Sequence, residues 1–373
     1  MQKLNYIDSF RGLAILSVLL FHIHSTVQSG ESYLPEALKH LFHSGNIGVQ
    51  LFYFASAFTI FLSFSQRNAK ENFPVKNFFI RRFFRIAPLY YFIIIYCLFQ
   101  FTFLRNMPVY FFGDPRDISA GNIVTHLTFL HGFFPLYVQS LVPGGWSIAV
   151  EIIFYCMVPF LYKKIKNSNQ ALSFILITLI IRTLFAFTFA NVYPMSEQTL
   201  WDEFTYCFIL NQLPVFAIGI LFYFMITEDK TQFNPLYILI LFGLTVSDLL
   251  TGKEIFLPFH IKFSFAFLLL AMAMNKYDFT IISNVFFKFI GKISYSMYLV
   301  HLLIIAAINK SGILDAIIVY DLKSTLILFA AKFTLTLILS VLFSLMLYQF
   351  IEQPGQKMAK RIIDRLEHKN TMT

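Results

Sequence analysis

The chain has 373 residues, of which 57% are hydrophobic and only 13% are charged. A soluble domain of this length needs far more polar surface to cover its core, so the composition excludes an ordinary water-soluble protein. The mean hydropathy of +0.67 and the repeated apolar runs instead predict an all-α, polytopic integral membrane protein. Orientation in the membrane then accounts for the net charge of +9, and no nucleic-acid partner is expected.

Apolar stretches predict about ten transmembrane helices. One integrated bundle is expected, because no Gly/Ser-rich or Pro-rich linker interrupts the chain. The first span lacks a small-residue cleavage site, which indicates a retained helix and not a signal peptide. The stretch 123–142 is apolar but broken by Gly132 and Pro135, so we expect it to be re-entrant or interfacial. The expected spans are 10–27, 46–65, 86–104, 145–162, 171–190, 205–226, 235–251, 258–275, 289–309 and 324–350.

Basic residues gather in alternate loops of this topology. If the N-terminus is cytoplasmic, most of the 29 Lys and Arg residues fall on the cytoplasmic side. The positive-inside rule therefore predicts that both termini are cytoplasmic. After Pro354 the chain becomes basic and amphipathic, as expected for a segment at the membrane surface. We divide the chain into a transmembrane domain, 1–355, and a basic cytoplasmic tail, 356–373.

The first span carries an arginine near its beginning and two histidines near its end. Each helical residue turns by about 100°, so Arg11 and His22 share a face and are separated by about 16 Å of rise. His24 points to the opposite side and is interpreted as an interfacial residue. The imidazole of His22 is suited to proton transfer near neutral pH. The alternative is a packing histidine that forms a hydrogen bond to a neighbouring helix.

Three arginines, Arg81, Arg82 and Arg85, precede the third span and lie close together on the helix surface. Such a cluster can bind phosphate groups through charge-assisted hydrogen bonds. The alternative is ordinary anchoring, in which the arginines contact anionic membrane lipids.

Two further polar groups lie at the beginnings of later spans. Ser147 and Glu151 are four residues apart, hence on one helical face beside Trp146, and could bind or polarise a hydroxylated substrate. In the ninth span Ser294, Tyr298 and His301 form one stripe, whose cytoplasmic end carries the basic residues Lys288 and Lys292. For both groups the alternative is hydrogen bonding between packed helices.

Other polar residues within apolar surroundings receive no role from the sequence. Arg182 and Lys332 have no partner that spacing predicts. His126 and His131 lie in the broken outer stretch, where they could line an acceptor site. No paired cysteine spacing suggests disulfides or a metal site, and the three cysteines are interpreted as small hydrophobic residues: Cys97, Cys156 and Cys207.

Four of these segments, in this order, resemble the membrane-bound acyltransferase-3 family. They are "FRGLAILSVLLFH" at the start, "RRFFRIAPLYY" before the third span, "WSIAVE" at the fourth, and "GKISYSMYLVH" late in the chain. A terminal "IEQP" also fits, so the resemblance extends over residues 8 to 354. It implies that 1–355 is an acyltransferase-3-like domain.

Members of that family are multi-spanning enzymes that O-acylate, mostly O-acetylate, extracytoplasmic carbohydrates such as O-antigen, exopolysaccharide and peptidoglycan. The resemblance implies acetyl-coenzyme A (acetyl-CoA) as donor and a glycan acceptor. No metal is expected, since the sequence contains no metal-binding HExxH motif, and the expected location is the bacterial cytoplasmic membrane. It also implies that His22 is the catalytic histidine, with Arg11 as its partner and Arg82 and Arg85 as the paired arginines. Some relatives carry a fused esterase-like domain, whereas this chain is expected to act alone or to pass its acyl group to a separate partner protein.

The polar residues of the apolar helices and the family resemblance together predict an O-acetyltransferase. His22 acts either as general base or as the carrier of the acyl group, and the sequence leaves both open. A polytopic glycan transporter or flippase, or a glycan polymerase, is the alternative. We assign catalysis to His22, Arg11, Glu151 and Ser147, and donor binding to Arg82, Arg85, Lys292, Ser294 and Tyr298.

Overall fold

The computed structural model describes residues 5–104, 118–189, 192, 197–228, 233–251, 254–277 and 279–371. Within these ranges the chain forms helices and connecting turns, without a β-strand. The elements are α1 Asn5–His24, η1 Gln28–Tyr33, α2 Glu36–His43, η2 Ser44–Ile47, α3 Gly48–Asn68, α4 Pro74–Leu104, α5 Ala120–Leu127, η3 His131–Phe133, α6 Trp146–Lys164, α7 Ser168–Phe189, α8 Gln198–Cys207, α9 Ile209–Thr227, α10 Pro235–Thr251, α11 Phe259–Lys276, α12 Val285–Lys292, α13 Ser294–Ser311, α14 Leu322–Leu347, the π-helical η4 Tyr348–Glu352 and α15 Gln353–Thr371.

Seven helical stretches in the described part of the chain are long and apolar enough to cross a membrane. An eighth is possible if α12 and α13, which meet at an angle of 77°, together form one broken span. The seven stretches are Tyr6–His24, Glu36–Asn68, Pro74–Phe101, Trp146–Lys164, Ser168–Phe189, Gln198–Thr227 and Leu322–His368.

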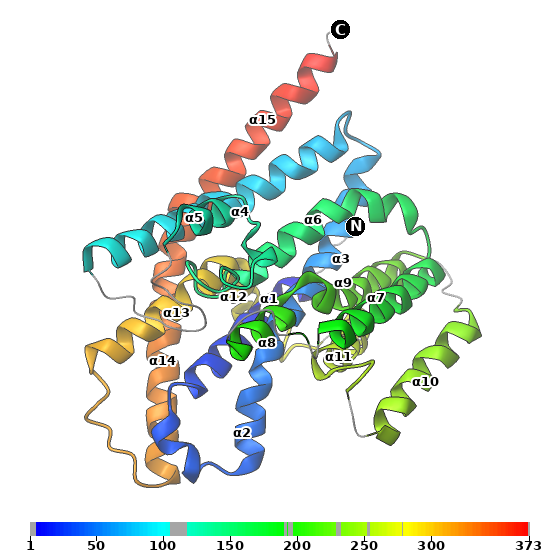
Figure 1. Cartoon of the computed structure of the whole chain (residues 1–373). Coiled ribbons are helices and arrows are strands. Elements are labelled where there is room, and N and C mark those ends of the chain that lie inside the picture. Colours follow the sequence, from blue (N-terminus) through cyan, green and yellow to red (C-terminus); the bar gives the residue numbers. More distant parts are fainter. Residues whose placement is uncertain are drawn as a thin grey trace.

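The expected all-α, multi-pass architecture is therefore confirmed, while the expected count of ten spans is not. Two of the ten, at α10 and α11, are not among the seven stretches found in the described residues, where α10 has 17 residues. Figure 1 places α10 at the edge of the molecule. The expected span 289–309 contains a bend, because the helix breaks at Ile293 between α12 and α13. The cytoplasmic position of both termini stays a prediction.

Helix α1 is packed unusually closely between two neighbours. On one side, a Cβ atom at Gly12 would collide with the Phe287 carbonyl of α12, and a Cβ atom at Gly291 would collide with the Asp8 carbonyl of α1. On the other side, Gly48 at the start of α3 allows the same close approach to the Ala14 carbonyl. Only glycine lets the helix backbones meet at this distance. The packing fixes α1 in the middle of the bundle.

Aromatic stacking holds α3, α6 and α9 together. Phe216 of α9 stacks on Tyr53 of α3 with ring centroids 4.5 Å apart, and on Phe154 of α6 at 4.2 Å. Phe54 of α3 and Phe222 of α9 also stack, with ring centroids 5.6 Å apart. These buried contacts orient the faces of α3 and α6 that carry the polar side chains described below.

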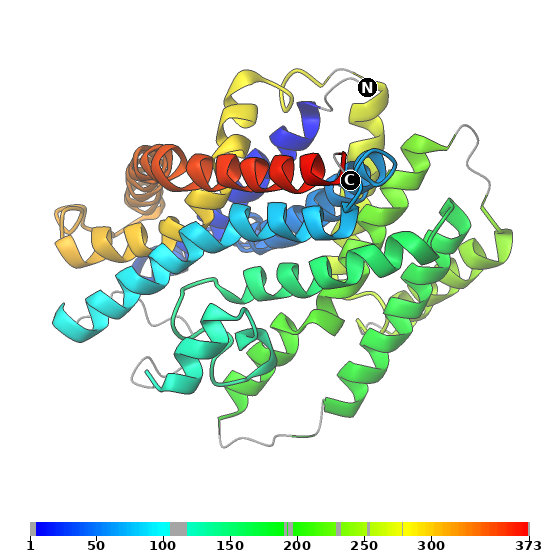
Figure 2. The same cartoon turned by 90° about the horizontal axis from the view of Figure 1, so that it is seen from above.

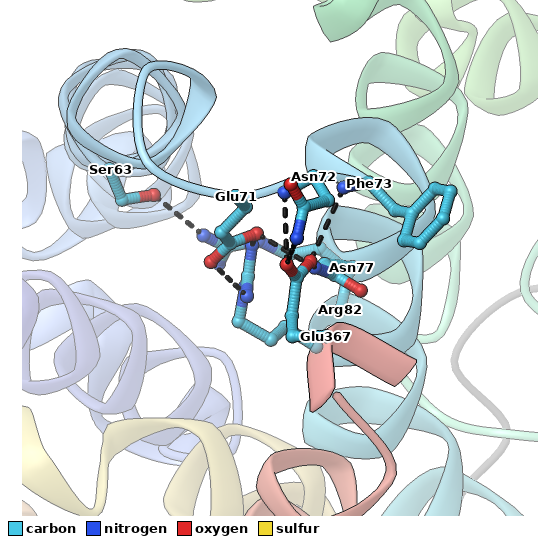
Figure 3. A network of polar contacts seen from close by, with 8 residues as sticks. Ser63, Glu71, Asn72, Phe73, Asn77, Arg82 and Glu367 are labelled. Carbon is cyan, nitrogen blue, oxygen red and sulfur yellow. Dashed lines mark hydrogen bonds and ion pairs between the residues drawn. The ribbon is translucent and has the colours of Figure 1, made fainter. Parts of the chain in front are cut away.

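The C-terminal helix α15 runs alongside α4 (Figure 2). The Glu367 carboxylate accepts hydrogen bonds from the backbone N–H and side-chain amide of Asn72, at 2.9 and 2.8 Å, and from Asn77 Nδ2 at 2.6 Å. Figure 3 shows this carboxylate against the turn between α3 and α4, with Arg82 reaching Ser63 nearby. The expected domain boundary after residue 355 falls within the first turn of α15, and the division into two segments stays a prediction.

Replacing Gly12 or Gly291 by alanine is expected to push α1 and α12 apart and to destabilise the protein by about 1–3 kcal/mol. The thermal midpoint of the detergent-purified protein measures this loss. Gly243→Ala is the control, because a Cβ atom at Gly243 meets no atom of the described residues within 4 Å. Equal thermal midpoints for Gly12→Ala, Gly291→Ala and the control would contradict the role of close packing.

Candidate active site

A narrow cavity of about 60 Å³ lies where α1, α3, α4, α6 and α13 meet. We call it the arginine cavity, because three arginines from two different helices line it. Most of its polar lining consists of site residues predicted from the sequence: Arg11, Arg82, Arg85, Ser147, Glu151, Ser294 and Tyr298. The fold therefore brings together residues that are nearly 290 positions apart in the chain.

Two of the arginines are held by neutral hydroxyl groups. Arg11 Nη2 donates to Thr59 Oγ1 at 2.9 Å, and Arg11 Nη1 lies 3.5 Å from the Asp8 carboxylate. Arg82 Nη2 donates to Ser63 Oγ at 3.3 Å, and its guanidinium lies 5.4 Å from the centroid of the Tyr155 ring. Asp8 and the lining residue Glu151 offset part of the charge of the three arginines, but the surroundings stay positive, so the cavity suits an anion.

Arg81 and Lys292 do not line this cavity. Arg81 instead makes a bidentate ion pair with Glu71, with distances of 2.8 and 2.9 Å. Lys292 is exposed, and its ammonium lies 5.4 Å from the ring centroid of Tyr348. The structure thus separates Arg82 and Arg85 from the other basic residues of their surroundings.

The acidic and hydroxyl groups of the cavity are bound to one another across helices. Glu151 Oε1 accepts a hydrogen bond from Ser56 Oγ at 2.6 Å. Ser147 Oγ donates to Tyr298 Oη at 2.8 Å, and Tyr298 Oη donates to the Gly144 carbonyl at 3.1 Å. Gly144 has φ of +72°, a left-handed conformation that places its carbonyl beside α13 and favours glycine.

A second, larger cavity of about 500 Å³ contains His22 and Trp146 in its lining. We call it the histidine cavity. Tyr298 and Val49 line both cavities, so the two adjoin at these side chains. Arg11 and His22 share one helix as predicted, but each opens into a different cavity. Trp146 lines the histidine cavity, whereas Ser147 and Glu151 line the arginine cavity. These three residues, expected together near the acceptor, are therefore divided between the two cavities.

His22 lies beside a second histidine. The rings of His22 and His301 are 5.3 Å apart, and His301 is fully buried. His301 Nδ1 lies 2.6 Å from the Tyr298 carbonyl, which can only accept, so Nδ1 carries the hydrogen and Nε2 is an acceptor. Helical spacing predicts that His301 belongs to a polar stripe, but it does not predict the contact between His301 and His22. His24 is not part of the cavity lining, and its ring lies 5.5 Å from that of Phe42.

Several unassigned residues turn out to have local partners. Arg182 donates to Asn211 Oδ1 at 3.0 Å and to the Ile255 carbonyl at 2.7 Å. Lys332 donates to the Thr26 carbonyl at 3.0 Å, near the end of α1. These contacts join helices and place neither cation in the arginine or the histidine cavity.

His126 and His131 are buried and stack face to face, with ring centroids 4.0 Å apart. His131 Nε2 lies 3.1 Å from the Gly145 carbonyl and donates to it, which supports the turn before α6. Both residues lie outside the seven membrane-spanning stretches. Burial lowers the pKa of His131 to about 4 and the pKa of His126 well below its usual value, so both are neutral at pH 7.

This pair predicts a loss of stability on acidification. The unfolded chain binds protons near pH 6.5, whereas folded His131 binds its proton only near pH 4, so the free energy of unfolding falls between these values. Each unit of pKa difference is worth about 1.4 kcal/mol, so His131 accounts for a loss on the order of 3 kcal/mol. Thermal midpoints at pH 7.5, 6 and 5 measure the effect. His131→Gln is expected to be less sensitive to acid, and equal sensitivity would contradict this role.

Among the described residues, no three His, Cys, Asp or Glu side chains form a group that could hold a metal ion.

A family model described as an acyltransferase domain, acyltransferase-3, matches residues 4–348. The chain belongs to the acyltransferase-3 family. With its apolar helices, membership in the acyltransferase-3 family supports a multi-pass membrane acyltransferase.

Two relatives carry acetyltransferase names. ORF330 of Acidianus two-tailed virus, named as an acetyltransferase, is 25% identical over 326 residues, covering 84% of this chain and 88% of ORF330. The O-acetyltransferase OatA of Staphylococcus aureus (strain NCTC 8325 / PS 47) is 24% identical over 377 residues, covering 94% of this chain. The chain spans only 57% of the length of OatA. No solved structure matches this member of the acyltransferase-3 family.

Proposed function

We propose that this protein transfers an acetyl group from cytoplasmic acetyl-CoA to a hydroxyl group of a cell-surface polysaccharide. The observation that carries the proposal is the meeting of a basic cavity with a histidine-containing cavity at Tyr298 and Val49. The names of OatA and ORF330 support acetyl as the acyl group. The bacterial cytoplasmic membrane is the proposed location.

The arginine cavity is the proposed site at which the donor binds. Coenzyme A carries several phosphates, and Arg82 and Arg85 offer charge-assisted hydrogen bonds to them. Arg11 of α1 adds a third cation to the lining of the same cavity. Glu151 interacts electrostatically with both Arg11 and Arg82, so its carboxylate orients the arginines without neutralising all three.

His22 is the proposed general base for the acceptor hydroxyl. One imidazole nitrogen takes the hydroxyl proton as the oxygen forms a bond to the thioester carbonyl carbon. The carbon–sulfur bond then breaks, and the thiolate of coenzyme A takes the proton back from His22. A two-step version, in which His22 carries the acetyl group first, uses the same arrangement. In both the one-step and the two-step version, the thioester extends from the arginine cavity to His22 where Tyr298 and Val49 line both cavities.

His22→Ala is expected to lower glycan acetylation by about a hundredfold or more, because a general base contributes about 10²–10⁴ in rate. The measurement is NMR of surface polysaccharide from cells expressing each variant, with O-acetyl methyl signals recorded before and after mild alkali. His24→Ala is the matched control, since His24 lies on the same helix outside the histidine cavity. A wild-type acetyl signal in the His22→Ala cells would exclude the mechanism.

Arg85→Ala is expected to raise the KM for acetyl-CoA by about tenfold or more, because a hydrogen bond to a charged group contributes about 1.5–3 kcal/mol. Arg81→Ala is the control, as its guanidinium is paired with Glu71. Acetyl-CoA turnover by the purified protein measures both values. A flippase or a polymerase shows no such turnover, so its absence in the wild type favours those alternatives.

A further inference from the structure

The two cavities differ in charge. The arginine cavity is lined by three arginines and one glutamate. The histidine cavity is lined by Asp202 and Glu203, and no lysine or arginine occurs among the described residues that line it. The charge of the lining favours an anion in the arginine cavity and disfavours an anion beside Asp202 in the histidine cavity, so the two cavities suit different kinds of molecule.

One helix provides much of this second lining. Gln198, Thr199, Asp202, Glu203 and Tyr206 of α8 all face the histidine cavity, and their spacing places them on one side of the helix. Its other side is anchored in the core. Trp201 is buried, and its ring lies 5.6 Å from that of Phe189 and 5.4 Å from that of Phe204. The polar face of α8 is therefore held toward the cavity by the apolar face behind it.

The remaining lining has the chemistry of a sugar site. Trp146 and Tyr206 offer aromatic faces, with ring centroids 6.0 Å apart, and Tyr206 Oη is held by Gln50 Nε2 at 3.1 Å. The amides of Asn46 and Gln139 both donate and accept hydrogen bonds. A cavity of about 500 Å³ lies within the usual range for small-molecule sites, in which aromatic surface and a few polar groups fix the ligand.

We propose that the sugar unit accepted beside His22 is uncharged or carries an amino group, and that Asp202 and Glu203 exclude acidic glycans. This inference rests on the proposed acetyl transfer. Hydroxyl groups donate charge-assisted hydrogen bonds to the two carboxylates, and an ammonium group adds an ion pair. A uronate, sulfate or phosphate placed there faces like charge. The same carboxylates keep the phosphates of acetyl-CoA in the arginine cavity.

Binding can be measured separately from catalysis, because Trp146 lines the histidine cavity and the chain has only one other tryptophan, Trp201. The probes are malto-oligosaccharide, deacetylated chito-oligosaccharide and oligogalacturonide of equal length. Tryptophan fluorescence of the full-length protein in detergent gives each Kd. Radiolabelled acetyl-CoA, with alkali lability of the product, reports transfer in parallel.

The wild type is expected to bind the neutral or the amino glycan about tenfold or more tightly than the acidic one, since about 1.4 kcal/mol of repulsion suffices. Asp202→Asn and, independently, Glu203→Gln are expected to reduce the ratio between the Kd for the acidic glycan and the Kd for the neutral or amino glycan. Glu197→Gln is the matched control, because Glu197 precedes α8 and does not line the cavity. Size-exclusion profiles identify any variant that fails to fold, and the other variant then carries the test.

Equal or tighter binding of the acidic glycan, no binding of any probe, or an unchanged ratio in both folded variants would overturn the inference. The expected binding preference without acetyl transfer to any probe would instead overturn the proposed function and leave the selectivity of the cavity standing. The two failures are thus distinguishable.

Discussion

The close packing of α1 between α12 and the start of α3 is the constraint on which the site depends. Gly12 and Gly291 let two helix backbones meet on one side, and Gly48 does the same on the other. Because α1 cannot shift between these neighbours, Arg11 and His22 are held at fixed positions relative to α3, α6 and α13. One helix thereby contributes a cation to one cavity and an imidazole to the adjoining one.

Polar side chains inside an apolar bundle are costly unless they find partners, and here the partners determine the geometry. Thr59 holds Arg11, Ser56 holds Glu151, and Ser147 holds Tyr298. Each pair joins two helices, so the same hydrogen bonds that satisfy buried groups also orient the candidate site. These neutral hydroxyl groups restrain their partners and add no charge of their own to the site.

Helix α13 links the two cavities. Tyr298 lies at their junction, and its carbonyl fixes the orientation of His301 beside His22. Opposite charges on either side of this junction give each substrate of the proposed reaction its own compartment. A donor rich in phosphate and a glycan acceptor can then approach one another without competing for the same residues.

Apolar runs determined by themselves that the protein is helical and multi-pass, because a bilayer demands long apolar segments with internally paired backbones. Helical periodicity likewise placed Ser147 with Glu151, and Ser294 with Tyr298, since these pairs depend only on one turn of helix. Tertiary structure alone decided that Lys292 lies outside the arginine cavity, that Arg11 and His22 open into different cavities, and that His301 joins His22. Those relations depend on how helices that are distant in sequence cross. The close approach of α1 and α12 at Gly12 and Gly291 helps to set that crossing, and the periodicity of a single helix does not reveal it.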